Sequence, residues 1–589
     1  MNVIGISAFY HESSCCLLQD GKLVAAVAEE RFTRVKHDAS LPLLAFRYCL
    51  EAGGIGVKDV DAIGYYESPR KKLSRQLWTG KPLGGDSGLP WLDVRRPERE
   101  IRQRLGFDGP IDYFDHHLSH AASSYFFSGF PDAAVLTVDG VGEWATTTYG
   151  AARGGDIALF EQVDFPNSLG LLYSTITGYL GFRVNSAEYK VMGLAPYGKP
   201  LYVDKIRELL TEGPDGQYAL SMQYFDFLRE SRMYSDALAE LFGEPPRVAE
   251  SAILPFHKDV AKSLQVVLEE ILLAKARYLK SKVDSPNLCM AGGVALNCVA
   301  NGRVLRDGPF DRLFVQPAAG DSGACLGAAA LSYVKRTGKR HSEERLQHVY
   351  LGPAYSSAQV AGMLEDMGIE ALDFRGREAA LLEAVVDRMA AGHVIGWFQG
   401  AMEFGPRALG ARSIIADPRF EDMRERLNRL VKKREAFRPF APSVLEEHAG
   451  KHFALDHTSP FMLETCQVSS SIAMPAITHV DGSARPQTVS TRHSPRYAAL
   501  IEAFYRRTGC PVIVNTSFNV RSEPIVCSPD DALMCMANSD IDSIVVEDFI
   551  IDRAALPRQW SALLRSLKFE PPSEVGARGE ISPTVYTFF

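Results

Sequence analysis

The chain has 589 residues, of which 46% are hydrophobic and 23% charged, and its formal net charge is −8. At roughly 150 residues per domain, this length predicts about two to four domains, each with enough apolar residues for a core. The acidic balance and the scattered basic residues argue against a nucleic-acid-binding protein or a partner of anionic membranes, so we expect small, soluble ligands.

The sequence lacks the features of secreted and membrane proteins. Met1–Ile6 has no basic leader, and no later run reaches about 18 apolar residues. The ten cysteines are scattered and form no CxxC pair. We therefore expect a cytoplasmic protein with reduced, partly buried thiols.

The first predicted elements are short strands. Residues 2–30 have the pattern of three strands, and Asp20-Gly21 is a typical hairpin turn between the second and third. Residues 133–152 repeat the pattern with another pair of strands. Two lobes that each begin with a hairpin favour an α/β class with the duplicated fold of actin, sugar kinases and heat-shock ATPases.

Two residues of this first lobe are candidates for chemistry. His11 lies in the turn between the first two strands, where an imidazole can act as a general base on a hydroxyl, although it can equally be an exposed loop histidine. Lys36 lies in the mixed charge run 29–37. Such a run is usually a solvated helix face, but this lysine could reach a phosphate.

A metal site is predicted around residues 115–139. His116 and His120 are four residues apart, so a helix would present both imidazoles on one face. Asp139 ends the apolar run 133–138, which is typical of a buried strand. Taken alone, two surface histidines one turn apart would be the more common explanation of this spacing.

Further along the chain, glycines follow predicted strands. A strand at 288–291 leads into Gly292 and Gly293 and then a helix, an order that suits a nucleotide phosphate. Asp321 stands at a similar turn before an alanine-rich helix and is the natural partner of the other three metal ligands. A set of two imidazoles and two carboxylates favours iron, manganese or zinc.

The remaining segments of this half carry weaker signals. Glycines such as Gly170 in 165–199 allow a ligand to approach the backbone closely, but they also occur in ordinary turns. Residues 66–112 permit no functional assignment. We expect a helical insertion suited to acceptor specificity at 201–255, and an amphipathic helix at 258–282.

A second domain is predicted to begin near residue 350. Beyond this point, arginines stand beside glycine and proline, which holds their forked donors ready for phosphate oxygens. The predicted strand 512–514 is followed by a further polar segment, Asn515–Asn519. An anion pocket is the better interpretation of the combined motifs, whereas each arginine alone would be a surface residue. The segments are Gly405–Ser413, Lys432–Arg434, Phe437–Pro442, Ala484–Val489 and Asn515–Asn519.

With these residues in view, the chain resembles the O-carbamoyltransferases typified by tobramycin carbamoyltransferase, the cephalosporin carbamoyltransferase and nodulation protein U. The resemblance runs from Met1 to about Asp552. It implies a metal-dependent, threonylcarbamoyl-transferase-like domain at 1–350 and a YrdC-like α/β domain at 351–565. From their content of Pro, Glu and Gly, residues 566–589 are expected to form a tail. The motifs that carry the resemblance are the His11 turn, Glu29–Phe32, His116–His120, Asp139-Gly140, Lys190–Pro196, Gly292–Asn297 and Gly320–Gly323.

The resemblance also implies roles for individual residues. His11 would be the catalytic base, and Fe²⁺ would be the metal. The implied metal ligands are His116, His120, Asp139 and Asp321. The implied nucleotide or carbamoyladenylate contacts are Lys36, Gly170, Gly292, Gly293 and Asn297. The implied carbamoyl-phosphate and ATP contacts are Arg407, Lys432, Arg438, Met462, Arg485, Asn515 and Ser517, with Arg412, Arg492 and Arg521 less clearly matched.

The activity that the resemblance implies has two steps. The second domain would convert carbamoyl phosphate and ATP, with Mg²⁺, to carbamoyladenylate, and the first would pass the carbamoyl group to a hydroxyl of a small natural product, as in antibiotic tailoring. The protein would be a monomer or homodimer. A transfer-RNA threonylcarbamoyl transferase, a hydrogenase-maturation carbamoyl carrier and a non-enzymatic actin-like scaffold remain as alternatives, and no residue identifies the acceptor.

Overall fold

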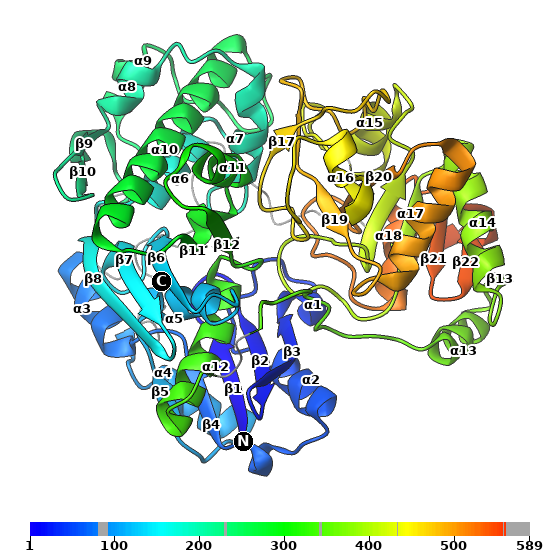
Figure 1. Cartoon of the computed structure of the whole chain (residues 1–589), viewed down its shortest axis with the longest axis horizontal. Helices are drawn as coiled ribbons and strands as arrows, with labels where there is room; N and C mark the ends of the chain where they lie inside the picture. Colours follow the sequence, from blue (N-terminus) through cyan, green and yellow to red (C-terminus); the bar gives the residue numbers. More distant parts are fainter. Residues whose placement is uncertain (80–91, 229–231, 341–343, 433, 558, 561–589) are drawn as a thin grey trace. The chain divides into compact units, whose positions relative to one another are not determined.

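The computed structural model forms two compact units (Figure 1). One unit contains Met1–Glu30 and His37–Leu346, and the other contains Arg31–Lys36 and the described residues between Gln347 and Trp560. The predicted tail, 566–589, lies outside the described residues. The structure describes residues 1–79, 92–228, 232–340, 344–432, 434–557 and 559–560.

The first sheet of unit 1 has the strand order β3-β2-β1-β4-β5. The first three strands are antiparallel, and β4 and β5 run parallel to β1. Asp20 and Gly21 join β2 to β3 with φ angles of 48° and 80°, as a tight hairpin requires, which confirms the predicted turn. The strands are β1 (Asn2–Ser7), β2 (Ser14–Gln19), β3 (Lys22–Ala28), β4 (Ala62–Tyr65) and β5 (Ile111–Tyr113).

The second sheet of unit 1 repeats this arrangement in the order β8-β7-β6-β11-β12. Again the first three strands in the chain, β6, β7 and β8, are antiparallel. The two later strands, β11 and β12, run parallel to β6 and lie on its other side. The shared order confirms the predicted duplicated fold. The strands are β6 (Asp132–Val138), β7 (Ala145–Arg153), β8 (Asp156–Asp164), β11 (Asn287–Ala291) and β12 (Arg312–Val315).

Helices α5 (His116–Tyr125) and α12 (Asp321–Thr337) pack against each other, and α12 also covers β1 and β4. Glycines make this close packing possible. A Cβ atom on Gly327 would lie 1.9 Å from the carbonyl oxygen of Ser119, and one on Gly5 would lie 1.9 Å from that of Cys325. The two helices that carry three of the predicted metal ligands therefore approach closely enough for the backbone of α12 to contact the backbone of α5.

The longest helix is α10 (Pro255–Lys282), which confirms the amphipathic helix predicted at 258–282. Its apolar stripe, including Leu264 and Ile271, is buried. The other helices of unit 1, apart from α8 and α9, are α2 (Leu43–Gly53), α3 (Pro69–Thr79), α4 (Arg96–Glu100), α6 (Leu169–Tyr179), α7 (Glu188–Leu194) and α11 (Cys298–Asp307), and α1 (Glu30–Thr33) begins at the last residue before Arg31–Lys36.

The predicted helical insertion at 201–255 is wrong in part. Two short helices, α8 (Val203–Arg207) and α9 (Asp236–Phe242), flank a hairpin of β9 (Leu210–Glu212) and β10 (Tyr218–Leu220). The turn contains Asp215 and Gly216 with φ angles of 55° and 71°. An Asp-Gly pair favours this left-handed turn over a continuous helix.

Unit 2 is built on an eight-stranded mixed sheet in the order β13-β22-β21-β14-β15-β20-β16-β19. It belongs to the expected α/β class, and the strand predicted at 512–514 is found within β20. The strands are β13 (Leu372–Asp373), β14 (Ile395–Phe398), β15 (Arg412–Ala416), β16 (Ala441–Leu445), β19 (Gln487–Val489), β20 (Val512–Ser517), β21 (Ser543–Val546) and β22 (Phe549–Asp552).

Helices pack their apolar faces on this sheet and complete one continuous core, which includes the fully buried Trp397 and Phe504. A separate two-stranded sheet pairs β17 (Cys466–Gln467) with β18 (Ser483–Ala484). The helices are α13 (Ser357–Met367), α14 (Glu378–Ala390), α15 (Met423–Arg426), α16 (Glu446–His452), α17 (Pro495–Thr508) and α18 (Pro529–Asn538).

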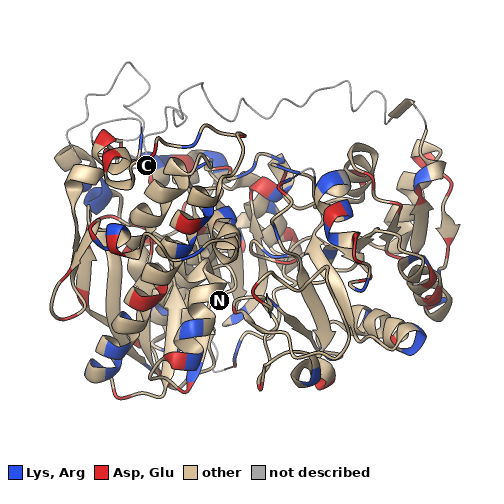
Figure 2. Cartoon of the chain, turned by 90° about the horizontal axis from the view of Figure 1, so that it is seen from above, with Lys and Arg blue, Asp and Glu red and all other residues tan. Residues whose placement is uncertain are grey.

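Three whole-chain features bear on the sequence predictions. All ten cysteines are free and buried, as expected. Within the described part of the chain, no helix combines the length and the apolar composition needed to cross a membrane. Basic and acidic residues are interspersed along the ribbons in Figure 2.

Candidate functional site

Helix α5 places His116 and His120 on one buried face, because residues four apart lie one turn apart. The start of the helix is held by Glu143, whose two carboxylate oxygens accept the N–H of His116 at 3.0 and 3.1 Å. An acceptor is needed here because the first N–H groups of a helix have no partner within it. Glu143 was not predicted, although it follows Asp139 by only four residues.

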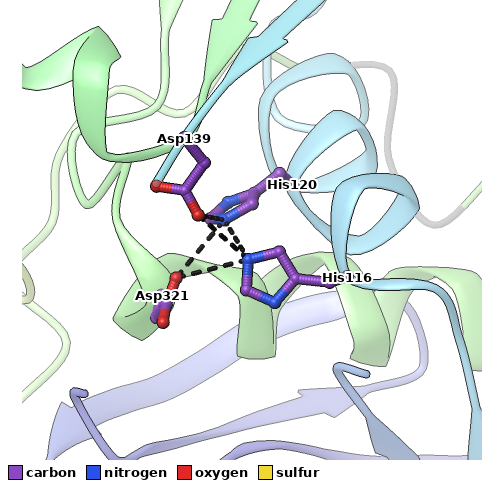
Figure 3. A group of neighbouring side chains, drawn as sticks. All are labelled: His116, His120, Asp139 and Asp321. Atoms are coloured by element: carbon purple, nitrogen blue, oxygen red, sulfur yellow. Dashed lines mark hydrogen bonds and ion pairs between the residues drawn. The ribbon is translucent and has the colours of Figure 1, made fainter. Parts of the chain in front are cut away.

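The structure brings His116, His120, Asp139 and Asp321 together, as Figure 3 shows. The Nε2 atoms of the two histidines are 3.0 Å apart. Asp139 Oδ2 lies 3.1 Å from the first and 3.4 Å from the second, and Asp321 Oδ1 lies 3.4 Å from both. All four residues are buried. Asp139 follows β6, and Asp321 begins α12.

This spacing fits a divalent metal ion. With metal–ligand bonds of about 2.0–2.2 Å, neighbouring ligand atoms lie about 2.9–3.6 Å apart. The five distances above fall in that range. In addition, a buried pair of carboxylates needs compensating positive charge, which one divalent ion supplies. The donor set of imidazole and carboxylate without thiolate suits iron, manganese or zinc.

The protonation of the cluster reflects the same charge balance. Burial alone would lower the pKa of His120, but hydrogen bonds and charge from Asp139 and Asp321 raise it to about 9. The pKa of His116 is also raised, because the two carboxylates outweigh its burial. Burial would raise the pKa of Asp139, but the two imidazoles hold it well below its usual range. Without an ion, a proton on His120 thus offsets negative charge in the cluster.

The second oxygen of Asp139 is held by the glycine pair. The N–H of Gly293 donates to Asp139 Oδ1 at 2.8 Å. Gly292 has a φ of 93°, and a Cβ atom there would lie 2.3 Å from the carbonyl oxygen of Val138, so this position requires glycine. The predicted phosphate-binding N–H of Gly293 is thus engaged with a candidate metal ligand, and the nucleotide contact of this pair stays a prediction.

Two other predicted nucleotide contacts also have partners within unit 1. A Cβ atom on Gly170 would lie 2.6 Å from the carbonyl oxygen of Asp139, so this glycine packs on the chain next to the cluster. Asn297 caps α11 by accepting the N–H of Ala300 at 3.0 Å, and its amide donates to Gln265. Gly170 therefore packs beside a candidate metal ligand, whereas Asn297 links the start of α11 to α10.

His117 faces away from the four-residue group. Its Nδ1 atom lies 2.6 Å from Thr137 Oγ1, and the ring is fully buried. Burial and the neighbouring charge of His116 lower the pKa of His117 well below its usual value. A neutral imidazole bound to a strand hydroxyl is a core residue, although its sequence position alone makes it look equivalent to the other two.

His11 lies in the bend between β1 and β2, where unit 1 places it beside Glu12 and His37. Its Nε2 atom is 2.6 Å from the carbonyl oxygen of Asn185. These neighbours were not predicted. Glu12 adjoins His11 in sequence and could have been noticed, but only the tertiary structure brings Asn185 and His37 to the ring.

Lys36 is placed differently from the other predicted nucleotide contacts. It belongs to the segment Arg31–Lys36, which clusters with unit 2. Arg34 in this segment donates to the carbonyl oxygens of Pro524 and Ile525 and pairs with Asp531 at 3.3 Å. Lys36 itself is close enough to Lys432 for its charge to lower the pKa of that residue.

Lys432 is a buried lysine with a full set of oxygen partners. Its Nζ atom contacts the carbonyl oxygens of Ser517 and Asn519 at 2.7 and 2.8 Å, and their side chains at 3.2 and 2.6 Å. Burial, together with Arg434, Arg438 and Lys36, lowers its pKa well below the usual range. Lys432 therefore shapes the end of β20 by holding its backbone.

Asn515 lies next to Lys432's partners on β20. Its amide donates to Gln487 Oε1 at 2.8 Å and to Ser443 Oγ at 3.0 Å, which orients it across three neighbouring strands. Its side-chain oxygen is buried without a hydrogen-bond partner among the described atoms. Arg485 is half-buried, and a single proline separates it from Gln487, the first residue of β19.

The remaining predicted contacts of unit 2 differ in exposure. Arg407 and Arg438 are half-buried, and Arg438 lies 3.6 Å from Glu435. Met462 is buried and has a φ of 57°. Arg412 is fully buried, and its guanidinium donates to three carbonyl oxygens and stacks on Phe398, so it serves the core. Arg492 is exposed, and Arg521 is half-buried.

Comparisons with family models match most of both units. A model described as Carbamoyltransferase N-terminus matches residues 2–79 and 98–330, and one described as Carbamoyltransferase C-terminus matches residues 386–553. The first of these ranges contains all four residues of the buried cluster, and the second contains Lys432, Asn515 and Ser517.

Full-length relatives show the same similarity. The chain is 43% identical over 600 residues to uncharacterized protein sll1178 of Synechocystis, covering 95% of this chain and 98% of that protein. It is 39% identical to nodulation protein NolNO of Sinorhizobium fredii, with 95% and 82% covered. It is 36% identical to the 3'-hydroxymethylcephem-O-carbamoyltransferase of Streptomyces clavuligerus, with 91% and 96% covered.

Proposed function

Because the chain belongs to the carbamoyltransferase family, and is thus an enzyme that transfers carbamoyl groups, we propose that it is an ATP-dependent O-carbamoyltransferase. Its substrates would be carbamoyl phosphate, ATP and a hydroxyl group of a small natural product. The observation that carries this proposal is the buried convergence of two histidines and two aspartates at strand and helix ends of a duplicated fold.

Unit 2 is the proposed site of activation. Water would hydrolyse carbamoyl phosphate there to carbamate and inorganic phosphate, and a carbamate oxygen would attack the α-phosphate of ATP to give carbamoyladenylate and pyrophosphate. Arg407, Arg438 and Arg485 would bind the phosphates, since forked guanidinium donors match phosphate oxygens. Lys432 would position Ser517 and Asn519 through its four contacts. Enclosure matters because carbamate decomposes readily in water.

Unit 1 is the proposed site of transfer. A bound divalent ion, with Fe²⁺ as our first choice, would polarise the carbamoyl carbonyl as a Lewis acid. Asp139 is kept in position for this by the Gly293 N–H, and His116 by the helix that Glu143 caps. Burial of the four side chains keeps water from competing with the acceptor.

His11 is the proposed general base. It would take the proton from the acceptor hydroxyl while the hydroxyl oxygen bonds to the carbamoyl carbon and AMP leaves. The ring has a firm hydrogen bond to Asn185 and is only partly buried, so a substrate can reach it. Lys36 would offer a positive charge to the nucleotide. Its segment, Arg31–Lys36, belongs to unit 2.

The names of two relatives support the proposed class of acceptor. One is named for a hydroxymethylcephem and another for nodulation, which supports a small hydroxylated product or signal as the acceptor. The threonylcarbamoyl and hydrogenase-maturation alternatives would need a transfer-RNA or protein partner. The family models and the named relatives favour neither of them.

The test is an assay of the full chain with carbamoyl phosphate, ATP, Mg²⁺ and a panel of hydroxylated natural products. We expect pyrophosphate release that depends on carbamoyl phosphate, and one product with the added mass of a carbamoyl group. Reactions that lack ATP or carbamoyl phosphate are the controls. Carbamoylation without ATP would disprove the adenylate route, and pyrophosphate release without any O-carbamoyl product would favour the alternatives.

A further inference from the structure

The surroundings of His11 determine which ring nitrogen carries hydrogen. Nε2 lies 2.6 Å from the carbonyl oxygen of Asn185. A carbonyl oxygen can only accept a hydrogen bond, so Nε2 must donate. In the neutral ring the lone pair is then on Nδ1, and this is the nitrogen that can take up a proton.

The carbonyl that sets this tautomer is itself held firmly. Asn185 has a φ of 58°, a left-handed conformation that asparagine tolerates better than most residues. Its N–H donates to Glu188 Oε1 at 2.7 Å, and the hydroxyl of Ser174 donates to the same oxygen at 2.8 Å. The start of α7 and the middle of α6 thus fix the direction of the Asn185 carbonyl.

A carboxylate lies on the other side of the ring. Glu12 Oε1 is 3.8 Å from His11 Nδ1 and 3.2 Å from His37 Nδ1. His37 Nε2 is 3.1 Å from Ser186 Oγ, and the two imidazole centres are 4.7 Å apart. Burial would raise the pKa of Glu12, but the hydrogen bond from His37 and the charges of both histidines lower it to about 2. The carboxylate is therefore ionised at neutral pH.

We propose that the Asn185 carbonyl and the Glu12 carboxylate make Nδ1 of His11 the proton acceptor of the transfer reaction, with Glu12 as a positioning residue. This inference rests on the proposed function. The acceptor O–H proton moves to Nδ1, the acceptor oxygen bonds to the carbamoyl carbon, and the bond from that carbon to the AMP oxygen breaks. The charged ring that results lies between a carboxylate and a carbonyl oxygen, both of which stabilise it.

His37 and Ser186 complete this arrangement. His37 donates from Nδ1 to Glu12, which keeps the carboxylate turned toward both rings. Ser186 follows Asn185 in the chain, so one short segment contacts the far nitrogen of each ring. The same backbone segment therefore sets the orientation of the base and of the residue that holds its carboxylate.

The first experiment measures the tautomer directly and does not require activity. The full chain is labelled with ¹⁵N-histidine, and the signals of His11 are identified by their absence from the His11→Asn spectrum. We expect the neutral ring to show a protonated Nε2 and an unprotonated Nδ1. The opposite tautomer would overturn the proposal, whether or not the protein proves to be an O-carbamoyltransferase.

The second experiment separates Glu12 from a merely structural role. We expect Glu12→Gln to lower kcat for transfer from supplied carbamoyladenylate on the order of 10- to 100-fold, with KM for the acceptor within about twofold. Pyrophosphate release should be unchanged. Glu12→Asp keeps the charge and should retain more activity than Glu12→Gln.

The matched control is Glu29→Gln, because Glu29 is another carboxylate of unit 1 but accepts the backbone N–H groups of Leu44 and Ala45 at the start of α2. We expect wild-type transfer from this variant. An equal loss of transfer kcat in Glu12→Gln and Glu29→Gln would overturn the role of Glu12. So would an unchanged transfer kcat in Glu12→Gln with an unchanged Tm. If wild-type protein neither releases pyrophosphate nor transfers, the proposed function fails instead.

A third measurement addresses a competing role for the same side chains. The ligand atoms of His11, Glu12 and His37 lie close enough together to hold a metal ion of their own. Elemental analysis of wild type and Glu12→Gln distinguishes the two roles. We expect the same metal content in both, and loss of one metal equivalent in the variant would overturn the proposal in favour of a second metal site.

Discussion

At the scale of single residues, the four candidate ligands depend on neighbours that are not ligands in our proposal. Gly293 donates to Asp139, and Glu143 accepts from His116. Such contacts orient ligands and tune their basicity. Residue identity alone does not separate His116 and His120 from His117, because all three are buried on one short helix. The direction of each ring separates them.

We expect His120→Ala to remove the bound metal and the transfer activity while pyrophosphate release persists. The reason is that His120 Nε2 lies within 3.4 Å of the ligand atoms of all three partners. Elemental analysis after anaerobic purification measures the first effect. His117→Gln is the matched control, since His117 bonds to Thr137 instead, and it should keep the metal. Full metal retention in His120→Ala would contradict the site.

In protein freed of metal by a chelator, we expect the free energy of unfolding to fall as the pH rises from about 6.5 to 9. The folded-state pKa of His120 is about 9 and its ordinary value is 6.5, so its contribution is complete below 6.5 and is lost as the pH passes 9. His116 shifts in the same direction. Asp139, with its lowered pKa, loses its contribution in acid instead.

Denaturant titration at several pH values checks this dependence. His120→Gln should flatten the decline above pH 6.5, and the metal-loaded protein should not show it, because bound metal replaces the protons. A decline of the same slope in wild type and His120→Gln would assign the effect to other groups.

At the scale of elements, the site depends on how closely α5 and α12 approach. Two of the cluster residues come from α5, and Asp321 begins α12. Gly327 lets the helices meet backbone to backbone at Ser119. The alanine-rich composition of α12 is visible in the sequence and predicts a helix, but its contact with α5 does not follow from any local pattern.

We expect Gly327→Ala to destabilise the protein by about 1–3 kcal/mol, because the added methyl group must push the two helices apart. Metal affinity should fall with it, since the shift separates Asp321 from the two histidines. Thermal unfolding and metal titration are the measurements. Gly362→Ala is the control: it is an exposed position in α13 with nothing within 4 Å of the new methyl group, and it should be neutral or stabilising.

At the scale of the whole molecule, the chain divides its predicted chemistry between two units. The imidazole and carboxylate cluster belongs to unit 1, and the arginine motifs belong to unit 2. Arg31–Lys36 is the exception, because this early segment clusters with unit 2 and is bound there through Arg31 and Arg34. We propose that activation and transfer can be lost separately.

We expect Arg485→Ala to abolish pyrophosphate release from ATP and carbamoyl phosphate while transfer from supplied carbamoyladenylate survives. The guanidinium of Arg485 is the proposed phosphate contact, and removing it leaves unit 1 unchanged. Arg506→Ala, an exposed arginine on α17 in the same unit, is the control for loss of one positive charge. Equal loss of both reactions in Arg485→Ala would argue against two separate sites.

Much of the fold could be predicted because local patterns report it. The Asp20-Gly21 hairpin, the α10 helix and the repeated strand hairpins are all specified by alternation, helical spacing and turn residues over short stretches. The hairpin at 210–220 was missed because its strands are only three residues long and lie between helices. Short elements carry too few residues for a periodic signal.

The sequence by itself determined which side chains are available: an HxxxH pair, aspartates after strands, and arginines beside proline and glycine. Only the tertiary structure decided which of them meet. The ligand atoms of His116 and Asp321 come within 3.4 Å although about 200 residues separate them, because two helices pack at a glycine. Likewise, the Asn185 carbonyl meets His11 because contacts with Ser174 of α6 and Glu188 of α7 position Asn185. Such contacts depend on the direction of each side chain across packed elements, which sequence spacing does not contain.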